Sequence, residues 1–118
     1  MLVEFDPKTG LGTVREELHV EYDGKLLVVP EGFRYDGASV PRLFWRLVFP
    51  PFDPRVARAA AVHDWIYQTH PEGWTRADAD DLFYSMLVAD GVERWRAHLA
   101  WLGVRIGGAA AWRQGGKA

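Results

Sequence analysis

The sequence predicts an α+β fold, in which an N-terminal β-hairpin or meander packs on a small bundle of three to four helices. Residues before position 40 show the alternating pattern of strands, and later residues show apolar side chains at the three- and four-residue spacing of helices. At 118 residues and 48% hydrophobic content, the chain suits one core. We therefore expect a single domain over 1–118, mainly β over 1–40, mainly α over 41–112, with a tail over 113–118.

The clearest β signal is a hairpin. Leu18, Val20 and Tyr22 alternate with polar residues, and Asp23-Gly24 is a strong two-residue turn signal. The chain then returns as a strand over 25–29, which the Pro-Glu-Gly run that follows should end.

Two helix starts follow the β region. Ser39 can cap a short helix that passes through Phe44 and Trp45. Asp53-Pro54 has the pattern of an N-cap followed by the first helical residue. It predicts a second helix that runs to about Thr69.

A third helix is expected over roughly 76–90, because Thr75 and Asp78 form a capping-box pattern and Gly91 suits the position after the last turn. Its predicted inward stripe is Ala79, Leu82, Phe83 and Met86.

A fourth helix is indicated by Trp95, Leu99, Leu102 and Ile106, whose spacings of four, three and four predict a core-facing stripe. Gly107-Gly108 should end this helix. We expect Trp112 to dock on the core and the residues after it to fray.

Composition, charge and the pattern of apolar residues argue against several classes of protein. With no cysteine, the chain has neither disulfides nor thiolate metal sites. A net charge of -2 argues against a nucleic-acid binder, which usually carries a basic patch. The N-terminus reaches acidic and turn residues too early for a signal peptide. The apolar stretch over 104–112 is too short for a transmembrane segment.

The most concentrated polar chemistry is a cluster on the second and third helices. His63 and Asp64 are adjacent, Tyr67 lies one turn further on, and a short connection makes Asp80 a neighbour from the next helix. Asp80 can accept a hydrogen bond from the His63 ring and fix its tautomer, which leaves the other ring nitrogen as a general base.

The residues alone leave two interpretations of this cluster open. Asp64, with the turn that contains Asp36, can ligate Ca²⁺ or another divalent cation beside a reactive His63. The alternative is a structural network, because a half-buried histidine bonded to a carboxylate is a common packing device. Arg76 is interpreted as a surface partner of Asp80, four residues on. We expect the other three histidines, His19, His70 and His98, to be structural or solvated.

Several motifs together resemble the phage and prophage family called domain of unknown function 1353. They are D-G-A-S-V-P-R over 36–42, A-V-H-D-W-I-Y over 61–67, R-A-D-A-D-D-L-F over 76–83, and then Gly107 and Trp112. The resemblance implies a phage or prophage origin and a location in the host cytoplasm or the virion. The implied partners are other phage proteins or a component of the host envelope.

The H-D-x-x-Y and A-D-x-x-F pair also resembles the helix pair of phospholipase A2, over about twenty residues. Carried over, that resemblance makes His63 the general base, Asp64 a Ca²⁺ ligand, Asp80 the group that orients His63, and Tyr67 a supporting hydroxyl. The glycine-rich calcium loop of those enzymes has only a loose counterpart at 35–38.

Two functions follow as expectations. The first is a phage accessory protein with a metal-assisted hydrolytic site that acts on an ester or amide of the host envelope. The second is a non-catalytic virion or assembly component in which the His-Asp cluster is structural.

Overall fold

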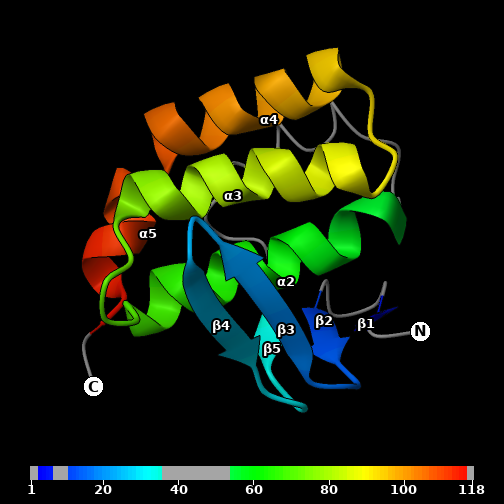
Figure 1. The fold of residues 1–118 in the computed structure, drawn as a ribbon, viewed down its shortest axis with the longest axis vertical. Helices are drawn as coiled ribbons and strands as arrows, with labels where there is room; N and C mark the ends of the chain where they lie inside the picture. Colours follow the sequence, from blue (N-terminus) through cyan, green and yellow to red (C-terminus); the bar gives the residue numbers. More distant parts are fainter. Residues whose placement is uncertain (1–2, 7–10, 36–53, 117–118) are drawn as a thin grey trace.

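The structure is a computed structural model, and it describes residues 3–6, 11–35 and 54–116. Its strands are β1 (Val3–Asp6), β2 (Leu11–Val14), β3 (Leu18–Tyr22), β4 (Lys25–Val29) and β5 (Arg34–Tyr35). Its helices are α2 (Pro54–Thr69), α3 (Arg76–Ala89), α4 (Arg94–Gly107) and α5 (Ala109–Gln114). Antiparallel strands thus precede a group of helices (Figure 1), and the predicted α+β class is confirmed.

The strands form two antiparallel sheets. β1, β2 and β5 make a three-stranded sheet in that order, and β3 and β4 make the predicted hairpin. Asp23 and Gly24 at the hairpin turn have φ values of 51° and 77°, which a tight two-residue turn between antiparallel strands requires. In the other sheet Gly12 lies opposite Tyr35, whose ring would collide with a Cβ atom at position 12.

Local signals place the second and third helices where the sequence predicts them. α2 begins at Pro54, while the expected N-cap Asp53 and the short helix through Phe44 and Trp45 lie outside the described residues. The capping box of α3 is present, with Thr75 Oγ1 accepting from the Asp78 N–H at 3.1 Å. Gly91 has a φ of 100° and follows the end of this helix.

α2 and α3 lie antiparallel, with α3 between α2 and α4, and α2 also contacts the strands (Figure 1). Arg58 near the start of α2 donates to both carboxylate oxygens of Asp90 just beyond α3, at 3.0 and 2.8 Å. The α3 stripe predicted to face inward is buried at all four positions: Ala79, Leu82, Phe83 and Met86. The short connection between the helices therefore brings their polar residues together, as predicted.

The orientation of α4 differs from the prediction. The expected core-facing stripe points outward, with Trp95 59%, Leu99 37% and Ile106 81% exposed. The buried residues of this helix are instead small or medium: Ala97, Ala100, Gly103 and Val104. Small side chains let two helix axes approach closely, so α4 packs on α3 through that face. The apolar periodicity was identified correctly, but the stripe faces solvent.

The end of the described chain is docked rather than frayed. α5 extends to Gln114, and the Gly116 N–H donates to the Gln68 carbonyl at 2.8 Å. Trp112 docks as predicted, stacking on His70 with 3.7 Å between ring centroids and meeting the Tyr67 ring edge-on at 5.3 Å. No helix of the described part of the chain is long and apolar enough to cross a bilayer.

Candidate active site

Three ionisable side chains lie inside the core where α2 faces α3. His63 is 1% exposed, Asp64 4% and Asp80 0%. Buried ionisable groups are retained only where partners compensate for the lost hydration. The contacts of these side chains therefore decide what the cluster does.

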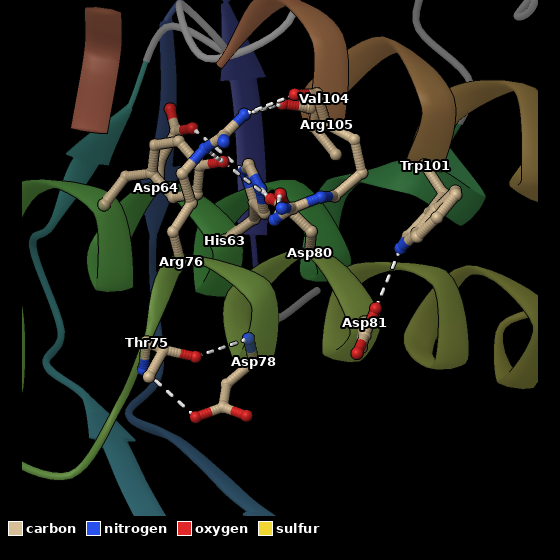
Figure 2. A network of polar contacts seen from close by, with 11 residues as sticks. His63, Asp64, Thr75, Arg76, Asp78, Asp80, Asp81, Trp101, Val104 and Arg105 are labelled. Atoms are coloured by element: carbon tan, nitrogen blue, oxygen red, sulfur yellow. Dashed lines mark hydrogen bonds and ion pairs between the residues drawn. The ribbon is translucent and has the colours of Figure 1, made fainter. Parts of the chain in front are cut away.

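Asp80 is the centre of the cluster (Figure 2). Its Oδ1 lies 2.7 Å from His63 Nε2 and accepts a 2.7 Å hydrogen bond from the Tyr67 hydroxyl. Its Oδ2 accepts from Arg105 Nη1 of α4 at 2.9 Å. The predicted hydrogen bond between His63 and Asp80 is confirmed, and each oxygen of the buried carboxylate has a donor.

Arg76 does not form the predicted surface pair with Asp80. Its Nε donates to the Tyr67 hydroxyl at 3.1 Å, and its Nη2 donates to the carbonyls of Val104 and Arg105 at 2.8 and 2.6 Å. Carbonyls in the last turn of a helix have no partner within it and attract cations. Arg76 therefore ties the C-terminal end of α4 to the Asp80 cluster, and the partner of Asp80 is Arg105.

Sequence reasoning missed Arg105 as a site residue. It lies on the helix whose orientation was predicted wrongly, so nothing placed it near Asp80. The small residues Ala97, Ala100 and Val104 were the available signal. Had they been taken as the packing face, Arg105 would lie beside that face and within reach of α3.

Two aromatic rings and two carboxylates surround the His63 ring. Its centroid lies 4.3 Å from that of Tyr67 and 4.7 Å from that of Phe83. With Nε2 at Asp80, Nδ1 lies 3.9 Å from Asp64 Oδ1. One ring nitrogen is thus held by the Asp80 carboxylate, and the other points toward Asp64.

Two opposing effects set the proton affinity of His63. Burial alone lowers its pKa, but the carboxylates of Asp64 and Asp80 outweigh burial and raise the pKa above its ordinary value of 6.5. Burial also raises the pKa of Tyr67, with a further contribution from its bond to Asp80. Tyr67 is therefore a neutral donor, and His63 is the group of the pair that takes up a proton.

The described residues do not by themselves make a divalent-cation site. They contain no group of three or more His, Asp or Glu side chains able to hold a metal ion, and Ca²⁺ takes six to eight oxygen ligands. Asp64 is the predicted ligand that the structure places beside His63. The other, Asp36, lies outside the described residues.

The remaining histidines are not part of the cluster. His19 is exposed beside Glu17, and His98 is exposed and stacks on Trp101. His70 stacks on Trp112, and its Nε2 is buried without a hydrogen-bond partner in the described part of the chain. These positions agree with the structural or solvated roles expected of them.

A surface cavity of about 320 Å³ lies away from the cluster. Residues of β3, α3 and α4 line it: Tyr22, Asp81, Tyr84, Ser85, His98 and Trp101. Trp101 Nε1 donates to Asp81 Oδ1 across its wall at 2.8 Å (Figure 2). None of the predicted site residues contributes to this cavity.

Comparisons with known proteins give relatives without assigned activity. The family described as "Protein of unknown function (DUF1353)" matches residues 12–104. The chain is similar to two proteins of Sinorhizobium fredii (strain NBRC 101917 / NGR234), described as uncharacterized proteins y4jT and y4iH, with 38% and 35% identity over 69 residues. These alignments cover 58% of this chain but only 20% and 28% of the relatives. No solved structure gives a significant match.

Proposed function

This chain belongs to the DUF1353 family, and we propose that it is a hydrolase in which His63 acts as a general base toward water. The observation that carries the proposal is the orientation of the His63 ring, with Nε2 2.7 Å from Asp80 and Nδ1 turned toward Asp64. A carboxylate at one ring nitrogen fixes the tautomer in which the other nitrogen accepts a proton. The substrate class we propose is an ester or amide of the host envelope, cleaved by a phage-type accessory protein.

The proposed reaction needs only water and groups of this chain. Nδ1 of neutral His63 takes a proton from water as the water oxygen bonds to the carbonyl carbon of the substrate. The protonated ring then gives that proton to the leaving oxygen or nitrogen as its bond to carbon breaks. Asp80 stabilises the imidazolium form, while Tyr67 and Arg105 hold the Asp80 carboxylate in place.

The burial of the His63 side chain favours a second candidate function. At 1% exposure, the ring meets a substrate only when the surrounding chain opens. A purely structural role also requires that buried polar groups have hydrogen-bond partners, and each oxygen of the buried Asp80 carboxylate has a donor. The second candidate is a non-catalytic virion or assembly component of the phage, in which these residues hold α2, α3 and α4 together.

His63→Ala separates the two candidates when activity and stability are measured together. If His63 is the general base, hydrolysis of phosphatidylglycerol vesicles, a p-nitrophenyl ester or an anilide should fall by roughly 10²-fold or more. Circular dichroism should show a folded variant. The matched control is His98→Ala, which removes an exposed ring outside the cluster and should retain full activity.

The opposite pattern would favour the structural candidate. A parent protein without activity on all three substrates, combined with a loss of about 1–3 kcal/mol in the free energy of unfolding of His63→Ala, would remove the hydrolase proposal. Assays with added Ca²⁺ and with a chelator test the metal separately. An activity that requires Ca²⁺ and is lost in Asp64→Asn would assign Asp64 as a ligand, with further ligands from outside the described residues.

A further inference from the structure

The outward face of α4 is an apolar surface without a partner among the described residues. We call Trp95, Leu99, Leu102 and Ile106 the outward stripe. Its members span three turns, and Ile106 and Trp95 are the most exposed, at 81% and 59%. α4 lies at the edge of the helical layer, with α3 between it and α2 (Figure 1). Large apolar side chains that line up on one exposed helix face mark an interaction surface.

Charge is segregated toward the same end of the chain. Residues 94–118 hold five Lys and Arg residues and no Asp or Glu, whereas residues 1–93 hold nine basic and sixteen acidic residues. The net charge of -2 therefore hides a basic C-terminal segment. Such asymmetry within a chain indicates a negatively charged binding partner for the basic part.

The basic residues of α4 flank the outward stripe. At 100° per residue, Arg94 and Arg105 fall on one margin of the stripe and Arg96 on the other. Arg94 is exposed, whereas Arg105 also pairs with Asp80 at 2.9 Å and Arg96 with Glu93 at 2.7 Å. Arg96 lies over the Trp95 ring, with 4.7 Å between its guanidinium carbon and the ring centroid. A helix with Trp and aliphatic residues on its outer face and Arg at the margins has the pattern of helices that lie in a membrane interface.

We propose that the outward stripe of α4 docks on the surface of an anionic lipid bilayer, with the helix in the plane of the membrane. Its 14 residues are about 21 Å long, too short to span a bilayer but long enough to insert one face among the headgroups. Pairing with α4 of a second copy is disfavoured, because it would bring the arginine margins of both helices together. Anionic headgroups instead complement exposed Arg94 and the outward parts of Arg96 and Arg105, whose side chains stay 29% and 32% exposed beside their carboxylate partners.

Vesicle flotation with the full chain tests this proposal. Binding is expected to vesicles that contain phosphatidylglycerol, to be weaker on pure phosphatidylcholine, and to decrease as salt rises, because salt screens the attraction of arginine to headgroups. Ile106→Ser should weaken binding about tenfold or more, since it removes a side chain that would enter the lipid. The matched control is Leu26→Ser, which changes a 78% exposed leucine on β4 and should bind as the parent does.

Both substitutions lie on the surface, so we expect both variants to unfold at the same thermal midpoint as the parent. Equal midpoints would show that any loss of binding does not come from a loss of folding. Absence of binding to anionic vesicles overturns the proposal, as does equal loss in the Ile106 and Leu26 variants. A dimer in sedimentation analysis that Ile106→Ser dissociates would also overturn it, in favour of a second copy. Flotation involves no reaction, so this inference stands or falls independently of hydrolysis at His63.

Discussion

At the scale of single residues, Asp80 explains why a histidine and a tyrosine are buried in the core of so small a protein and why a half-buried arginine reaches in toward them. A fully buried carboxylate is costly unless donors and positive charge surround it. His63, Tyr67 and Arg105 supply them, and they come from two different helices. Removal of any one partner leaves the carboxylate with too few donors. Substitution of any one of the three should therefore destabilise the whole cluster.

The pKa of His63 provides a direct test of this electrostatic arrangement. Because its folded-state pKa is raised, protonation of His63 stabilises the fold. That contribution is fully present below pH 6.5, the ordinary value, and is lost as pH rises through the raised folded-state pKa. NMR titration of the ring should therefore give a midpoint above 6.5, and any hydrolytic rate should rise with pH across that midpoint.

The same NMR titration on two variants identifies which carboxylate raises the pKa of His63. Asp64→Asn removes one of the charges that raise the pKa and should lower the midpoint of His63. Asp81→Asn changes a carboxylate that accepts a hydrogen bond from Trp101 and does not contact His63. This variant should have the same midpoint for His63 as the parent. A midpoint below 6.5 in the parent would mean that burial outweighs both carboxylates.

Arg105→Met tests the ion pair that sequence reasoning missed. The Asp80 carboxylate is fully buried while the Arg105 side chain is 32% exposed, so solvent screens part of their attraction. We expect a loss of about 2 kcal/mol or more in the free energy of unfolding, measured by urea titration. Arg94→Met, on the exposed side of the same helix, should change it by less than about 0.5 kcal/mol. Equal effects of the two substitutions would contradict the assigned role of Arg105.

At the scale of elements, the sequence predicted those features that depend on local chemistry. The turn at Asp23-Gly24 and the glycine after α3 follow from positive φ angles that few residues adopt. The start of α3 follows from the capping hydrogen bonds of Thr75 and Asp78. The contact between His63 and Asp80 follows from the short connection between two amphipathic helices. The sheet of β1, β2 and β5 was not predicted in detail, because the pairing of β2 with β5 joins segments that lie apart in the sequence and depends on contacts rather than local propensity.

The orientation of α4 could not be derived from periodicity alone. A period near 3.6 shows that one face is apolar, but not whether that face meets the core or a partner outside the chain. Here close packing through Ala97 and Ala100 decided the orientation, and the larger stripe was left outside. Because α4 was predicted in the wrong orientation, Arg105 was not predicted as a site residue. For the same reason the outward stripe was predicted to be buried rather than exposed.

Gly108, between α4 and α5, is a closely packed position at which any added side chain should be felt. A Cβ atom there would lie 2.7 Å from the Tyr67 hydroxyl oxygen and would also collide with the Val104 carbonyl. Gly108→Ala should lower the free energy of unfolding by about 1–3 kcal/mol through overpacking. Gly107→Ala, at an exposed position in the last turn of α4, should leave it unchanged or raise it by about 0.5–1 kcal/mol. Chemical denaturation of both variants measures the difference.

At the scale of the whole molecule, the last described helix packs against the first. α5 and the residues after it return to the C-terminal end of α2, where Trp112 contacts Tyr67 and His70, and Gly116 bonds to Gln68. Arg76 adds a tie from α3 to the end of α4. The cluster around Asp80 is thus covered on the Tyr67 side by Trp112, which the sequence predicted to dock, and its stability should depend on α5.

Substitution of two tryptophans by alanine tests this dependence. Trp112→Ala removes the ring that packs on Tyr67 and His70, and it should lower the free energy of unfolding by about 2 kcal/mol from lost apolar burial. Trp95→Ala removes a ring that is 59% exposed and should cost less than half as much. Because Tyr67 donates to Asp80, Trp112→Ala should also speed hydrogen exchange of amides near the middle of α2, whereas Trp95→Ala should not. If both variants unfold alike and exchange alike, the C-terminal segment does not support the cluster, and α2 and α3 hold it without help.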